Sequence, residues 1–102
     1  QLQSSAASDV YKRQVLIGPG VHFYTPSHPV KSKERVKSDG QYITNALPIK
    51  VGNNVWIGGN SSICQGVKIG SNTTIGANSL VLSDIPDGVL AYGNPCKVIK
   101  KL

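Results

Sequence analysis

The sequence is poor in the large side chains that fill a dense helical core. Its 102 residues include no Met, one Trp and one Phe, and hydrophobic residues make up only 39% of the chain. A chain of this length buries about 60–65% of the surface that it exposes when unfolded, so a core built by one chain alone is modest. The composition disfavours a helical bundle. It favours a single domain that buries small and β-branched side chains, or one that partner chains complete.

Long apolar runs and paired cysteines are also missing. No run approaches the ~18 residues of a membrane-spanning helix, and no apolar signal-peptide segment precedes a cleavage site. The two cysteines, Cys64 and Cys96, form neither a CxxC motif nor a disulfide framework, so we expect both to be packing residues. These absences predict a cytoplasmic protein with no membrane partner.

Acidic residues are few, with 5 Asp and Glu against 11 Lys and Arg, which gives a net charge of +6. The densest basic stretch, residues 31–37, is interrupted by Glu34. Nucleic-acid-binding surfaces usually combine clustered cations with groove-reading elements. We therefore expect no nucleic-acid partner, and the charge excess suits a modest anionic ligand at least as well.

A six-residue repeat is the strongest signal that is present. From Val51 the sequence divides into VGNNVW, IGGNSS, ICQGVK, IGSNTT, IGANSL and VLSDIP. The first position is always Val or Ile, and the fifth is small or β-branched, ending with Ile85. This period fits a short strand followed by a turn, with the first position pointing inward and Gly or Asn beside it allowing the bend.

Three such units complete one triangular coil, so the repeats predict two coils stacked at about 4.8 Å. The predicted fold class is all-β, a left-handed parallel β-helix, which departs from the usual right-handed crossover. Ile17 and Phe23 continue the pattern upstream, but Ile17 and Val51 are 34 positions apart, which is not a multiple of six. A protruding loop therefore interrupts the coil between about Tyr24 and Lys50. Loops of this length usually carry function, although a solvated linker is the alternative.

The two ends of the chain depart from the repeat. Residues 1–14 have no hexapeptide frame and no initiator Met, so we interpret them as a non-native or disordered leader. Residues 15–102 then form an N-terminally truncated β-helix domain. Residues 83–88 are expected to be a turn and residues 89–92 a strand. Residues 96–102 are expected to be a basic tail or a short final helix.

Four stretches together are distinctive: YTPSHP at residues 24–29, IKVGNNVWIGG at 49–59, DIP at 84–86 and GNPCKVIKKL at 93–102. Over residues 15–102 the chain resembles the C-terminal part of a hexapeptide-repeat sugar O-acetyltransferase, of the maltose and galactoside acetyltransferase group. Serine and xenobiotic acetyltransferases and some carbonic anhydrases share the hexapeptides alone, so the combination is the more specific sign.

The resemblance implies a homotrimer that holds acetyl-CoA, as co-substrate, between neighbouring subunits and moves the acetyl group directly to a sugar hydroxyl. His28 matches the catalytic general base, a role that suits a side chain able to change its charge near neutral pH. Its alternative is a hydrogen-bonded loop histidine. His22 is interpreted as a surface residue, and neither cysteine matches a nucleophile position.

The resemblance also implies acetyl-CoA contacts. Trp56 matches an indole that lines the cleft near the thioester, or else it caps a coil corner. Gly59 stands where some relatives have a Ser proposed to polarise the thioester oxygen, so a backbone N–H would have to serve.

Further contacts are implied along the rest of the acetyl-CoA molecule. Ala77 and Leu82 match positions whose backbone lines the pantetheine arm, and Ser83 stands where relatives have Lys or Arg. Lys97 and Lys100 match residues that meet the 3′-phosphate, although a solvated tail is their alternative.

Three other readings compete with this one. A carbonic anhydrase of this shape needs three His ligands for zinc, and the chain has two His, so we expect no metal. A non-catalytic scaffold predicts unbroken coils and regular outward Thr ranks, and an inactive remnant of the acetyltransferase predicts an incomplete acceptor pocket. The acceptor sugar stays open.

Overall fold

The computed structural model describes residues 14–102, so the expectation for the leader lies outside the described residues, apart from Gln14. Nearly all regular structure in this range is β, and one short 3₁₀ helix, η2 (Ser32–Glu34), is its helical element. The strands are β1 (Leu16–Ile17), β2 (His22–Tyr24), β3 (Pro26–Ser27), β4 (Asn45–Ala46), β5 (Lys50–Val51), β6 (Trp56–Ile57), β7 (Ser62–Cys64), β8 (Lys68–Ile69), β9 (Thr74–Ile75), β10 (Leu80–Val81), β11 (Val89–Gly93) and β12 (Cys96–Lys101).

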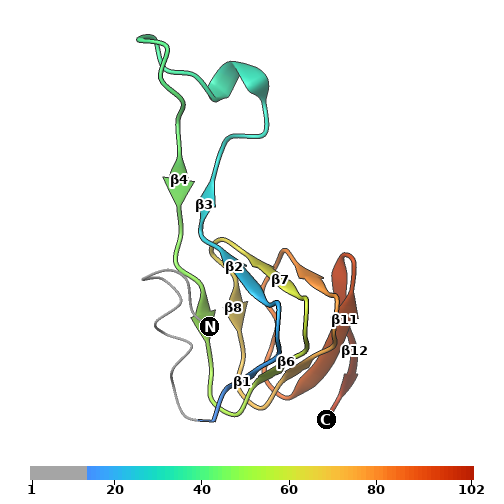
Figure 1. Cartoon of the computed structure of the whole chain (residues 1–102). Helices are drawn as coiled ribbons and strands as arrows, with labels where there is room; N and C mark the ends of the chain where they lie inside the picture. The colour runs from blue at the N-terminus through green and yellow to red at the C-terminus, as the bar shows by residue number, and fades with distance from the viewer. Residues whose placement is uncertain (1–13) are drawn as a thin grey trace.

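The short strands stack as coils of a parallel β-helix (Figure 1). Trp56 pairs with Thr74, and the same spacing of 18 residues relates the partners of β7 with β10 and of β5 with β8. Three hexapeptides therefore complete one coil, as the period predicts. Leu16 pairs with Trp56, 40 positions later, so 22 residues more than one coil lie between them.

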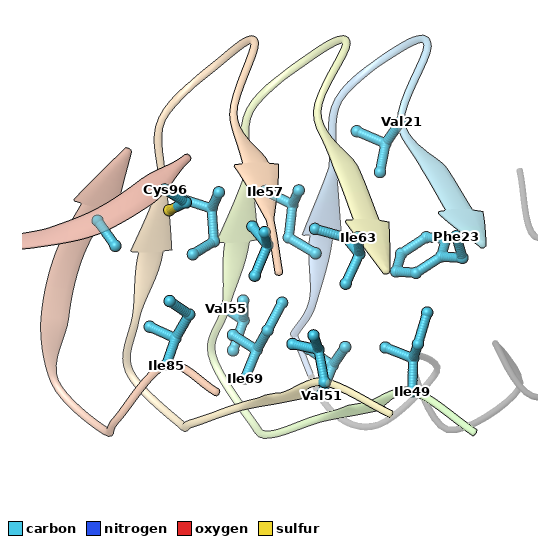
Figure 2. Packing of buried hydrophobic residues seen from close by; sticks show 14 of the residues in the cluster. Val21, Phe23, Ile49, Val51, Val55, Ile57, Ile63, Ile69, Ile85 and Cys96 are labelled. Atoms are coloured by element: carbon cyan, nitrogen blue, oxygen red, sulfur yellow. The ribbon is translucent and has the colours of Figure 1, made fainter. Parts of the chain in front are cut away.

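The aliphatic first positions fill the interior (Figure 2). Each hexapeptide from residue 51 to 81 begins with a side chain that is at most 3% exposed, and the fifth positions are buried beside them. Buried hydroxyls keep hydrogen-bond partners: Ser79 Oγ donates to the carbonyl of Gly76 at 2.6 Å, and Thr73 Oγ1 donates to that of Pro86 at 2.9 Å. The scarcity of large side chains is thus matched by a narrow coil that small residues fill.

The last coil is shorter than the repeat predicts. Ile85 bridges to Ile69, and Ala91 pairs with Ile75, so both spacings are 16 residues rather than 18. Ile85 was assigned to a fifth position, and this was wrong: it stands opposite a first-position residue of the preceding coil. The turn at residues 86–88 then leads directly into β11.

The expectation of which residue makes the bend also needs correction. Positive φ angles occur at the fourth position of the repeat, including Asn60 (60°) and Asn78 (61°). Glycine is needed at the second position for another reason, which is the close stacking of consecutive coils. A Cβ on Gly58 would lie 2.5 Å from the backbone nitrogen of Ala77, so only glycine fits there.

The interrupting segment runs from the end of β2 to the start of β5 and projects from the coils (Figure 1). Its stem is the antiparallel pair β3–β4, with Pro26 opposite Ala46. Gln65 Nε2 on the coil donates to Ser27 Oγ at 3.1 Å, which attaches the stem to the stack.

Residues 96–102 were expected to be a tail or a helix, and this was wrong, because residues 96–101 form strand β12, antiparallel to β11. The turn at residues 93–95 reverses the chain, and β11 at the end of the stack offers an edge that the returning strand can pair with. The β11–β12 hairpin thereby closes the end of the coil furthest from β1 (Figure 1).

Candidate functional site

His28 directly follows β3, at the outer end of the β3–β4 stem, and its side chain is exposed. Its Nδ1 lies 2.8 Å from the carbonyl oxygen of Ile43. A carbonyl oxygen can only accept, so Nδ1 donates, and in the neutral ring Nε2 keeps its lone pair. The hydrogen bond therefore holds the imidazole in the tautomer that a general base requires.

The partner of His28 belongs to a small hairpin. Ile43 N–H donates to the carbonyl of Arg35 at 2.7 Å, and Val36 forms an antiparallel bridge with Tyr42. Gly40 has a φ of 85°, and it lies in the reversing turn. Residues 35–43 therefore close on themselves and deliver the Ile43 carbonyl to His28.

His28 lines a cavity of about 600 Å³ together with Ser32, Arg35, Val36 and Tyr42. Ser32 and Arg35 lie three residues apart across η2, the spacing at which side chains of a 3₁₀ turn share a face. Sequence reasoning selected His28 alone. The only available signal for the other four was their place in the long interruption of the repeat.

Trp56 lies on a different surface. It is 56% exposed on β6 and lines a second cavity, of about 370 Å³, with Leu16 and Thr74 among its neighbours. Within the described residues the two cavities share no lining residue. A single chain therefore does not bring Trp56 and His28 into one pocket.

The five-stranded sheet does bring Trp56 and the β12 residues Lys97 and Lys100 onto one face. Directly paired residues point to the same side of a sheet, and the register links Trp56 to Thr74, Thr74 to Leu90 and Leu90 to Lys100. Lys97 pairs with Tyr92, two residues from Leu90 on β11, so it shares that face.

An irregularity in β12 makes this possible. Residues three apart on a regular strand point to opposite sides. A register shift between Leu90 and Ala91 inserts one extra residue in β12, and this places Lys97 and Lys100 on the same side.

The remaining predicted contacts lie at two corners of the coil. Gly59 and Ala77 occupy equivalent positions on consecutive coils, each two residues beyond the paired residues Ile57 and Ile75. They border the sheet that carries Trp56. Leu82 and Ser83 are exposed and follow β10, which belongs to another sheet, so the structure does not group them with Trp56.

The cysteines are placed as packing residues. Cys96 is buried and Cys64 half-buried, and burial raises the pKa of both thiols. A raised pKa disfavours the thiolate that a nucleophile would need. For Cys96, a hydrogen bond with Ser79 acts weakly in the other direction.

Residues 14–102 contain neither a metal-binding cluster nor a membrane-spanning helix. No cluster of three or more His, Cys, Asp or Glu side chains is placed to hold a metal ion there. No helix in the same part of the chain is long and apolar enough to cross a membrane.

Comparison with known proteins identifies relatives. Residues 48–83 match the family model described as bacterial transferase hexapeptide (six repeats). The galactoside O-acetyltransferase of Escherichia coli K12 is 47% identical over 88 residues, which are 86% of this chain and 41% of that protein. The chain spans less than half the length of the curated relatives it matches.

Solved structures agree with the sequence comparison. A maltose O-acetyltransferase from Clostridium difficile 630 has a TM-score of 0.77 at 46% identity, covering 86% of this chain and 45% of that one. A hexapeptide-repeat acetyltransferase from Vibrio cholerae, solved with acetyl coenzyme A, has a TM-score of 0.78 at 41% identity, covering 88% and 47%. By repeat, sequence and fold, the chain belongs to the hexapeptide-repeat acetyltransferases and corresponds to the C-terminal part of their chains.

Proposed function

We propose that residues 15–102 form an acetyltransferase domain that moves an acetyl group from acetyl-CoA to a sugar hydroxyl, with His28 as the general base. The observation that carries the proposal is the hydrogen bond between His28 Nδ1 and the Ile43 carbonyl, which leaves Nε2 free beside a cavity of about 600 Å³. Relatives named as galactoside and maltose O-acetyltransferases support the reaction class.

In this mechanism His28 Nε2 accepts the proton of the sugar hydroxyl as that oxygen attacks the thioester carbonyl. The C–S bond then breaks, and the imidazolium returns its proton to the departing sulfur, so CoA leaves as the thiol. No acyl-enzyme forms, in keeping with two cysteines whose raised pKa disfavours the thiolate. A backbone N–H at Gly59 is the donor we assign to the thioester oxygen.

We propose that acetyl-CoA lies along the outer face of the five-stranded sheet. Trp56 is placed at the thioester end, and Lys97 and Lys100, three strands away, meet the 3′-phosphate. At the spacing of paired strands, the rows of Trp56 and Lys100 are about 14 Å apart. Gly59 and Ala77 border this face.

Leu82 and Ser83 follow β10, on another sheet, and we assign them to an acetyl-CoA molecule bound on a neighbouring subunit. The separate cavities of His28 and Trp56 support the same arrangement, in which one subunit supplies the base and another the acetyl-CoA face. We therefore propose a homotrimer, in which each coil has the left-handed sense implied by the resemblance.

Thiol release across a panel of mono- and disaccharides, with acetyl-CoA as donor, tests the proposal. Wild type should release CoA thiol only when an acceptor sugar is present. His28→Ala should abolish release because the described lining of the cavity holds no other imidazole and no carboxylate to accept the proton. His22→Ala is the matched control, since His22 is exposed on the coil in β2 and should retain activity. Unchanged turnover in His28→Ala would rule out the general base.

A further inference from the structure

One residue that lines the cavity beside His28, Arg35, has a positively charged side chain. The described lining of the cavity comprises His28, the hydroxyl-bearing residues Ser32 and Tyr42, the apolar Val36 and the basic Arg35. We propose that the acceptor carries an anionic group, a carboxylate or a phosphate, that Arg35 binds while a sugar hydroxyl reaches His28. This inference rests on the proposed function and names the class of acceptor.

Arg35 and His28 are held by the same residue. The N–H of Ile43 donates to the Arg35 carbonyl at 2.7 Å, and its carbonyl accepts from His28 Nδ1 at 2.8 Å. The guanidinium and the imidazole therefore extend from a common hydrogen-bonded frame. An acceptor bound at one side chain is positioned relative to the other.

The acidic residues of the projecting segment do not line this cavity. Asp39 accepts a hydrogen bond from Gln41 N–H at 3.0 Å in the hairpin turn. Glu34 lines an adjoining cavity with Lys31, Lys33 and Ser32, and Ser32 is the residue that the two cavities share. No described carboxylate therefore competes there for the guanidinium or accepts hydrogen bonds from sugar hydroxyls.

The hydrogen-bond donors of Arg35 favour an anion over a neutral sugar. Guanidinium presents five N–H donors and no acceptor, in a planar fork that matches a carboxylate or phosphate. Residues 25–49 carry four Lys and Arg against two Asp and Glu, so the segment attracts anions as a whole. Tyr42 and Val36 provide apolar surface for the sugar ring.

A binding experiment tests this without requiring turnover. The imidazole signals of His28 are followed by NMR during titration with glucose, glucuronate, glucose 1-phosphate or inorganic phosphate, and the His22 signals serve as an internal reference. Glucuronate and glucose 1-phosphate should bind about tenfold more tightly than glucose, as expected for a charged hydrogen bond weakened by solvent. Their relative affinities distinguish the carboxylate from the phosphate.

Two variants test whether Arg35 causes the preference for anionic sugars. Arg35→Gln should remove the preference for anionic sugars. Lys33→Gln loses the same charge from the same segment but lines the neighbouring cavity, so it should keep the preference. Equal binding of glucose and both anionic sugars, no response of His28 to any sugar, or equal losses in the two variants would each overturn the inference.

The remaining outcomes separate this inference from the proposed function. Inorganic phosphate binding as tightly as glucose 1-phosphate would indicate a simple anion site and overturn the inference. Efficient acetylation of neutral sugars, without preference for anionic ones, would leave the proposed function standing and reject the anionic acceptor. Selective binding of anionic sugars without any acetyl transfer would reject the function and retain the binding site.

Discussion

At the residue scale, His28 is oriented by a main-chain carbonyl, so the hydrogen bond does not depend on the identity of residue 43. Side-chain replacement at Ile43 leaves that acceptor in place. Only a change in the path of the 35–43 hairpin would remove it, and the Val36–Tyr42 bridge and the Ile43–Arg35 hydrogen bond resist such a change. The tautomer of the proposed base is thus a property of the hairpin.

Lys97 and Lys100 are the residues to test for acetyl-CoA binding. The double variant Lys97→Ala/Lys100→Ala should raise the KM for acetyl-CoA about tenfold, because phosphate hydrogen bonds from exposed cations are moderate in strength. The KM for the sugar should change much less. Lys50→Ala/Lys68→Ala is the matched control, since these exposed lysines pair across β5 and β8 and their loss changes the net charge equally. Equal effects on both substrates would contradict a phosphate clamp.

At the element scale, the hexapeptide frame could be predicted because one buried first position per repeat is visible in sequence. The contacts within the interrupting segment could not be predicted from the sequence. His28 and Ile43 are 15 residues apart in a segment without periodicity, and the turn of the hairpin determines which side chains meet there. Strand β12 was missed because its pairing depends on the free edge of β11, and no repeat marks that edge.

The bend at the fourth position predicts the cost of replacing an asparagine. Asn78 has a φ of 61°, in a region that Asn tolerates and Ala does not. Asn78→Ala should lower the free energy of unfolding by about 1–2 kcal/mol, and Asn78→Gly should change it by only a few tenths. Urea unfolding measures both. Asn45→Ala on the exposed strand β4 controls for loss of an amide, and equal losses for the Ala and Gly variants at position 78 would contradict the backbone explanation.

At the scale of the whole molecule, association of chains would bring together two surfaces that a single chain keeps apart. Leu16 and Trp56, paired across β1 and β6, are 65% and 56% exposed. This apolar pair lies on the proposed acetyl-CoA face, whereas the proposed base lies in the projecting segment. A shared site between subunits uses both surfaces.

Mixing inactive variants tests the shared site. His28→Ala and Trp56→Ala should each lose most activity alone. An equimolar mixture that reassembles at random should recover about a quarter of wild-type activity, because an intact base meets an intact face at that fraction of all sites. Sedimentation should give three times the chain mass of 10.8 kDa. A monomer, or mixtures as inactive as either variant alone, would contradict a site built by two subunits.

The 40-residue spacing between Leu16 and Trp56 has an evolutionary consequence. The coils on either side of the inserted segment pair as though it were absent, and lengthening a surface loop has only a small entropic cost. Selection can therefore exchange the segment that carries His28 and Arg35 between members of the family without altering the sheet assigned to acetyl-CoA. Under the proposed function, an exchanged segment would change the acceptor while the donor stays the same.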